Sequence, residues 1–193
     1  MPQFRLLLSV LVLSQLVALT GCVPAIVAGA AGTAAVATDR RTVGSMIDDE
    51  NIELKASAII GTDAELKGVS HINVISMNGI VLLTGEAATT EARDRILTHV
   101  RGVNGVRRIT NEIQIASPSS LGSRGKDSLI TSAVKSRLAV TKGLDAGNVK
   151  VATEAGAVYL MGLVKRSEGD LAAELATGID GVQRVVKVFE YLD

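Results

Sequence analysis

Residues 72–85 read Ile-Asn-Val-Ile-Ser-Met-Asn-Gly-Ile-Val-Leu-Leu-Thr-Gly, and residues 149–162 read Val-Lys-Val-Ala-Thr-Glu-Ala-Gly-Ala-Val-Tyr-Leu-Met-Gly. The two stretches align without a gap, with apolar side chains and glycines at matching positions. Such alternation is typical of strands with one buried face. Asn78-Gly79 favours a tight turn because both residues tolerate positive φ, whereas Ala155-Gly156 keeps only the glycine. Each stretch therefore predicts a β-hairpin.

A second pair of matching stretches follows the hairpins. Gly102-Val-Asn-Gly-Val-Arg-Arg-Ile109 aligns with Gly178-Ile-Asp-Gly-Val-Gln-Arg-Val185. A helical pattern precedes each of them, and Gly102 and Gly178 are placed to end these helices. The chain therefore contains two copies of one unit of about 70 residues.

The pattern within each copy predicts the order αββαβ. Copy one is expected to contain a helix at 49–60, strands at 72–76 and 80–84, a helix at 89–101 and a strand at 106–115. The corresponding elements of copy two are expected at 127–141, 149–153, 157–161, 167–177 and 182–192. We therefore expect an α+β fold in which each copy has a three-stranded mixed sheet packed against two helices.

The N-terminus has the features of a lipoprotein signal. Arg5 precedes an apolar run from Leu6 to Leu19, and Leu19-Thr20-Gly21-Cys22 forms a lipobox around the only cysteine of the chain. The run is too short to span a hydrocarbon core of about 30 Å. We expect residues 1–21 to be removed and Cys22 to carry the acyl chains that anchor the protein to a membrane surface.

Composition then divides the mature chain. Residues 22–45 are predicted to be a tether because residues 23–37 are rich in Ala and Gly and carry no charge. A helix-packing segment of small residues is the alternative. The first repeat domain is predicted at 46–116, a Ser/Pro/Gly-rich linker at 117–123 and the second domain at 124–193.

The residue inventory argues against catalysis. His71 and His99 are the only histidines and have no counterparts in copy two, and the single thiol is the lipidation site. The spacings typical of metal ligands and of phosphate-binding loops are absent from the sequence. The basic residues lack the aromatic neighbours that stack on nucleic-acid bases. We expect no enzymatic activity, no cofactor, no metal and no nucleic-acid partner.

Charge distinguishes the copies. Residues 46–116 carry seven basic and ten acidic side chains, net −3, whereas residues 122–193 carry ten basic and nine acidic ones, net +1. The difference is concentrated in the first helices. Copy one has Asp48, Asp49, Glu50 and Glu53 beside Lys55, and copy two has Lys126, Lys135, Arg137 and Lys142 beside Asp127. An anionic membrane attracts the second set, at about 1 kcal/mol per basic residue near the surface.

The first helix of copy two also has two faces. Ile130, Val134 and Leu138 form an apolar stripe that is expected to face the sheet. The predicted lipid-binding residues lie on the other side: Leu129, Ser132, Lys135, Ser136, Ala139 and Lys142. An exposed Leu129 beside Lys135 suits insertion among lipid headgroups. Alternatively, Leu129 packs on the domain edge and the lysines form a solvated face.

Each copy resembles the BON domain. The resemblance is carried by Gly79, Gly85, Gly102, Gly105 and Val106, and again by Gly156, Gly162, Gly178, Gly181 and Val182. The eight glycines are predicted to be structural. The resemblance implies two tandem BON domains that bind phospholipid and attach to membranes without catalysis.

Two BON domains behind a lipobox resemble outer-membrane lipoproteins of Gram-negative bacteria. The resemblance implies recognition of anionic phospholipid by the first helix of copy two, a role in outer-membrane integrity, and association with the β-barrel assembly machinery and the division site. Such proteins tend to have a large aromatic residue where Leu129 stands, so weaker binding is expected here.

Val23 and Pro24, with no aspartate after Cys22, favour transport to the outer membrane, facing the periplasm. The alternative function is a periplasmic scaffold that binds proteins through sheet edges or the negative face of copy one, without intrinsic lipid recognition.

Overall fold

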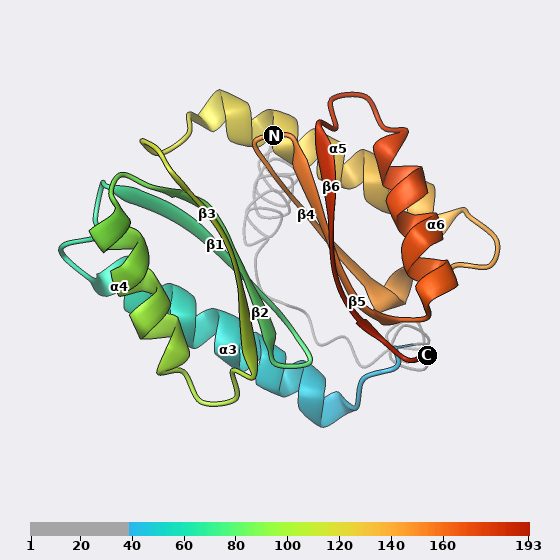
Figure 1. Ribbon diagram of the computed structural model, residues 1–193, viewed down its shortest axis with the longest axis horizontal. Coiled ribbons are helices and arrows are strands. Elements are labelled where there is room, and N and C mark those ends of the chain that lie inside the picture. The colour runs from blue at the N-terminus through green and yellow to red at the C-terminus, as the bar shows by residue number, and fades with distance from the viewer. Residues whose placement is uncertain (1–38) are drawn as a thin grey trace, which may run out of the picture. The chain divides into compact units, whose positions relative to one another are not determined.

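The computed structural model describes residues 39–193, all of which fall in one compact unit. Copy one consists of α3 (Val43–Thr62), β1 (Ser70–Met77), β2 (Ile80–Ala87), α4 (Thr90–Arg101) and β3 (Arg108–Ile115). Copy two consists of α5 (Leu121–Ala139), the 3₁₀ turn η1 (Ala146–Asn148), β4 (Val149–Glu154), β5 (Ala157–Val164), α6 (Arg166–Thr177) and β6 (Arg184–Tyr191). The predicted αββαβ repeat and α+β class are confirmed (Figure 1).

Each copy has its own three-stranded mixed sheet, with strand orders β1-β2-β3 and β4-β5-β6. In the antiparallel hairpin of copy one Val74 lies opposite Leu83, and in the parallel pair Val81 lies opposite Ile109. The pairing follows from the connections. A two-residue turn can join only antiparallel strands, whereas the helix between β2 and β3 returns the chain in the parallel direction.

The two hairpins turn at Asn78-Gly79 and Ala155-Gly156. The φ angles are 53° and 72° in the first turn and 48° and 74° in the second. Positive φ at both central residues is the signature of a type I′ turn, which matches the right-handed twist of the strands. The predicted hairpins are therefore confirmed, and Ala155 occupies a left-handed conformation that is costly for a residue with a side chain.

The predicted structural glycines have different environments. A Cβ atom at Gly85 would overlap the carbonyl oxygen of His71, and one at Gly162 would overlap that of Asn148. These two glycines allow the paired strands to approach. In contrast, Gly102 and Gly178 cap the second helices with φ angles of −78° and −81°, which other residues also adopt.

One face of each sheet packs against the two helices of its own copy (Figure 1). Aliphatic residues dominate both cores, in line with an aromatic content of only 2%. The first core includes Ile52, Ala56, Val81, Leu83, Ile96 and Val100, and the second includes Val134, Leu138, Val158, Leu160, Ala172 and Phe189.

The opposite faces of the two sheets share a third apolar cluster. It contains Met77, Ile80 and Leu82 from copy one and Ala157, Tyr159, Met161 and Val188 from copy two. Strand β2 is buried along its whole length, and so is nearly all of β5. Strands buried on both faces read as continuous apolar runs rather than alternating ones. The two copies therefore bury a common surface, which the alternation analysis did not predict.

Both first helices begin earlier than predicted. Helix α3 starts at Val43, inside the segment assigned to the tether, and Thr42 caps it by accepting from Ser45 N–H. Helix α5 starts at Leu121, so the linker assigned to 117–123 ends at Ser120, the capping residue. The prediction missed these turns because they are exposed and contain glycines, which have low helix propensity.

None of the helices in the described part of the chain is long and apolar enough to cross a membrane. Cys22, the signal segment 1–21 and most of the predicted tether lie outside the described residues. Acylation at Cys22 therefore remains a sequence prediction.

Candidate lipid-contact site

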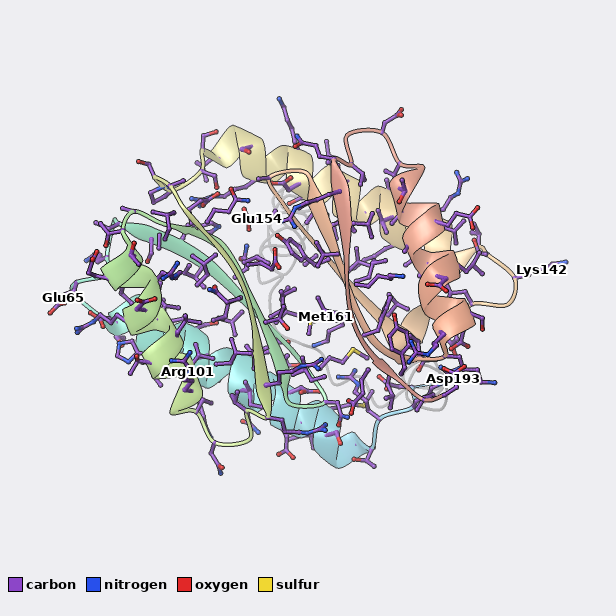
Figure 2. All side chains as sticks on the ribbon, viewed as in Figure 1. Glu65, Arg101, Lys142, Glu154, Met161 and Asp193 are labelled. Carbon is purple, nitrogen blue, oxygen red and sulfur yellow. The ribbon has the colours of Figure 1, made fainter. Side chains whose placement is uncertain are left out.

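Helix α5 buries one side and exposes the other. Val134 and Leu138 are buried in the second core, with Ile130 packed beside them. Every predicted lipid-contact residue is exposed: Leu129, Ser132, Lys135, Ser136 and Ala139 on α5, and Lys142 in the loop that follows it. Figure 2 shows Lys142 in this loop, at the edge of copy two. The structure thus brings the predicted residues to one accessible surface.

Two further apolar residues on this surface were not predicted. Leu121 is 83% exposed and Val140 is 81% exposed, compared with 73% for Leu129. Leu121 was missed because its turn was assigned to the linker, whereas Val140 lies inside the helix predicted at 127–141 and was assigned to neither of its faces. At about 100° per residue, Val140 lies about 20° and Leu121 about 80° around the helix from Leu129, and all three side chains are exposed.

Cations surround this apolar surface. Lys126, Lys135 and Arg137 are exposed on α5. The only acidic residue of the helix, Asp127, is buried, and its carboxylate accepts hydrogen bonds from Ala155 N–H at 3.0 Å and Gly156 N–H at 2.9 Å. The exposed face of α5 therefore carries cations and apolar side chains without an acidic residue.

Asp49 holds the equivalent turn in copy one. Its carboxylate accepts from Gly79 N–H at 2.9 Å and Asn78 N–H at 2.7 Å. Burial opposes ionisation, but these bonds, with others from Ser76 and Arg41, outweigh it and hold the pKa of Asp49 below its usual value. Alignment of the copies places an aspartate 29 or 30 residues before each turn glycine, and this repeated spacing is the signal in the sequence that points to a shared role.

The predicted negative face of copy one is consequently smaller than its sequence suggests. Asp49 is only 1% exposed, so counting it as surface charge was wrong. Glu53 pairs with Lys150 Nζ of copy two at 2.8 Å. Asp48 and Glu50 remain as the exposed acids of α3.

The two histidines lie in separate surroundings. His99 Nε2 is 2.7 Å from Asp63 Oδ2, which also pairs with Arg95. Burial and the nearby Arg124 lower the pKa of His71, so its neutral form is favoured. Within residues 39–193, no three His, Asp or Glu side chains are arranged to hold a metal ion.

The chain enters the fold through two arginines that bind different copies. Arg40 donates to both carboxylate oxygens of Glu168, at 2.6 and 2.7 Å, and its backbone N–H donates to Asn148 Oδ1. Arg41 pairs with Asp39 and Asp49. Asn148 belongs to η1, and η1 packs against α5, so Arg40 binds copy two at an element that contacts α5.

Comparison with known proteins agrees with this architecture. The BON domain model matches residues 48–117 and 126–193. The chain is 40% identical over 183 residues to Outer membrane lipoprotein DolP of Haemophilus influenzae, covering 95% of both chains. It is 39% identical to the 21 kDa hemolysin of Actinobacillus pleuropneumoniae, covering 80% of this chain and 79% of the relative. Identity to Osmotically-inducible protein Y of Escherichia coli is 27%, covering 74% and 72%.

The similarity to the Haemophilus influenzae lipoprotein covers 95% of the chain and therefore includes the segment that carries the lipobox. This similarity and that to the 21 kDa hemolysin confirm the predicted localisation as a lipid-anchored outer-membrane protein. With two matched domains and a relative that is 40% identical over 95% of both chains, this chain belongs to the BON-domain family and is similar to an outer-membrane lipoprotein of that relative's kind.

Proposed function

We propose that this protein is a non-enzymatic lipoprotein that binds anionic phospholipid membranes through α5. The observation that carries the proposal is the exposed surface of this helix, where Leu121, Leu129 and Val140 stand among cations with no exposed acid. Amphipathic helices of this kind lie in the membrane interface, with apolar side chains among the headgroups and cations near the phosphates.

The expected strength of this contact is modest. Full burial of a leucine side chain contributes about 1.5–3 kcal/mol, and Leu129 can be only partly buried at an interface. Each lysine near an anionic surface adds about 1 kcal/mol. The acyl chains on Cys22 would supply most of the membrane residence, and α5 would then act at the high effective concentration that tethering creates.

The wider role follows from the family relationship. We place this contact at the periplasmic side of the outer membrane, where it would help to maintain membrane integrity. Association with the β-barrel assembly machinery and the division site belongs to the same proposal and is supported by the family resemblance alone.

Vesicle binding tests the proposal directly. The mature chain carrying Cys22→Ser is titrated at low salt with vesicles containing phosphatidylglycerol, so that no acyl chain contributes. Leu129→Glu and Lys135→Glu should each weaken binding about tenfold or more, through lost insertion and reversed charge. Lys55→Glu on α3 makes the same charge change away from α5 and should leave binding nearly unaltered.

The absence of binding at low salt, where attraction to an anionic surface is strongest, would contradict the proposal. Equal losses from Lys55→Glu and Lys135→Glu would also contradict it, because they would indicate a response to net charge rather than to α5.

A protein-binding scaffold is the second candidate, and α3 is the feature that favours it. Val43, Ile47 and Leu54 are 58%, 56% and 71% exposed, and Asp48 and Glu50 lie on the same helix. Such a surface suits a basic partner segment with an apolar anchor and repels an anionic membrane. In cells, Leu54→Glu should abolish barrier function if the scaffold role dominates, whereas Leu129→Glu should abolish it if lipid contact dominates.

A further inference from the structure

A polar cleft of about 460 Å³ opens between β1 of copy one and α5 and β4 of copy two. Its walls combine two carboxylates, a guanidinium, an imidazole, an amide and hydroxyl groups. The residues that bear on its chemistry are His71, Asn73, Arg124, Thr131, Ser132 and Glu154. This mixture of donors and acceptors in one concave site is typical of small polar ligands.

Glu154 is the acceptor of the cleft. It is the last residue of β4 and only 3% exposed (Figure 2). Oε2 accepts a hydrogen bond from Asn73 Nδ2 at 2.6 Å, whereas Oε1 accepts none from any described residue. Burial raises the pKa of Glu154, with Glu86 and Asp127 adding to the effect. Every buried side-chain oxygen or nitrogen among the described residues has a hydrogen-bond partner, so Oε1, which has none, is the Glu154 oxygen that solvent reaches through the cleft.

The other two carboxylates at or near the cleft already accept hydrogen bonds, and the cleft also contains one cation. Asp127 is occupied by the two turn amides, and Glu86 Oε2 accepts from Ser119 N–H at 3.1 Å. Arg124 is the cation of the cleft, and its Nε and Nη2 donate to Ser119. Its Nη1 makes no hydrogen bond with the described residues, so the cleft offers a free acceptor and a free cationic donor.

The cleft adjoins the exposed surface of α5. Ser132 belongs to both, since it lines the cleft and is one of the exposed residues of the helix. Lys135 follows Thr131 by four residues and therefore lies one helical turn from the cleft wall. A phospholipid in contact with the exposed surface of α5 can therefore place its headgroup at the cleft beside Ser132.

We propose that this cleft receives the headgroup of a zwitterionic phospholipid with a primary ammonium, such as phosphatidylethanolamine. The ammonium donates to Glu154, and the phosphate pairs with Arg124, the cation that lines the cleft. Lys135 lies eleven residues from Arg124, about 16 Å along the helix, so it is placed to pair with a neighbouring anionic headgroup. The inference rests on the proposed membrane contact of α5 and adds a preference for one headgroup. A primary ammonium has three N–H donors, whereas the quaternary ammonium of phosphatidylcholine has none, so the cleft should distinguish the two.

The test uses the mature chain carrying Cys22→Ser and vesicles with a constant fraction of phosphatidylglycerol. The remaining lipid is either phosphatidylethanolamine or phosphatidylcholine. A hydrogen bond to a charged group corresponds to about tenfold in affinity, so binding should be about tenfold tighter with phosphatidylethanolamine. Glu154→Gln should remove this preference while retaining an acceptor for Asn73. Glu174→Gln, the same change at an exposed residue of α6, should retain it.

Equal binding to the two vesicle types, or a preference that survives in Glu154→Gln, would overturn the proposal. The proposed function is tested separately by the vesicles of phosphatidylglycerol and phosphatidylcholine, because binding to them requires only the anionic lipid. NMR titration with soluble phosphoethanolamine provides a second measurement on the unsubstituted cleft. Shifts at His71, Arg124 and Glu154 should follow phosphoethanolamine, and equal shifts with phosphocholine or glycerol 3-phosphate would overturn the ammonium assignment.

Discussion

Asp49 and Asp127 hold the two hairpin turns through the same interaction. Each carboxylate accepts the backbone N–H groups of both central turn residues. A buried carboxylate is costly unless hydrogen bonds replace its hydration, and two converging amides provide that replacement. The interaction joins the first helix of each copy to its hairpin, so these aspartates are structural and make no contribution to an exposed charged face.

Ala155 is the strained partner in the second turn. With φ at 48°, it adopts the left-handed conformation that Asn78 occupies in the first turn, and its side chain is exposed. Ala155→Asn should raise the free energy of unfolding by about 0.5–1 kcal/mol, because asparagine tolerates this conformation better. Ala155→Val should lower it. Urea denaturation at pH 7 measures both, and a destabilising Ala155→Asn would contradict the type I′ assignment.

At the scale of elements, α3 and α5 are repeats with different surfaces. Each buries an apolar stripe against its own sheet, and each exposes a leucine, Leu54 at 71% and Leu129 at 73%. The residues around the two leucines differ in charge, since Asp48 and Glu50 are exposed on α3 and Lys126, Lys135 and Arg137 on α5. The two copies thus share a fold, and the expected attraction of α5 rather than α3 to an anionic membrane depends on exposed side chains that do not take part in folding.

These two leucines form a matched pair for a fluorescence test. The chain contains no tryptophan, so a single introduced tryptophan reports its own surroundings. Leu129→Trp should bind anionic vesicles about fivefold more tightly, because tryptophan buries more area and prefers the interface, and its emission should shift to the blue. Leu54→Trp should show no shift. An equal response from both variants would contradict membrane docking through α5.

At the scale of the molecule, the two copies are joined by a common apolar cluster and by polar contacts. Asn78 Nδ2 donates to Glu190 at 2.7 Å, and Arg184 pairs with Glu112 at 3.0 Å. Tyr159 is buried in this region, and its burial raises the pKa of the hydroxyl to about 12. Arg40 and Arg41 add a further link between the copies, because Arg40 pairs with Glu168 of copy two and Arg41 pairs with Asp49 of copy one.

The Arg40–Glu168 pair gives stability a defined pH dependence. Its hydrogen bonds lower the pKa of Glu168 from 4.5 to about 2, so their contribution is complete above pH 4.5 and is lost as pH falls toward 2. Arg40→Ala should lower the free energy of unfolding by about 1 kcal/mol at pH 7. The difference in the free energy of unfolding between Arg40→Ala and the unsubstituted protein should decrease as the pH falls from 4.5 to 2.

Denaturation series across this range measure the effect. Arg101→Ala, at an exposed arginine without an ion pair among the described residues, serves as the control and should show no such window. A constant difference for Arg40→Ala at every pH would contradict the role assigned to Glu168.

The sequence by itself determined the repeat, the order of elements, the mixed sheets and the two faces of α5. These features depend on periodicity and turn chemistry among residues that are near neighbours in the chain. Helix starts were less predictable, because the exposed first turns of α3 and α5 lack apolar periodicity.

Only the tertiary structure decided which charges are free. In the sequence Asp49 and Asp127 resemble surface acids, but in the structure both are buried against the hairpin turns. Glu154 is likewise the end of a strand in the sequence, but it is buried in a cleft lined by β1 and α5. The common cluster of β2 and β5 likewise depends on packing between residues almost eighty positions apart. Burial and pairing over such separations arise from the folded arrangement of several elements, which the periodicity of a single helix or strand does not specify.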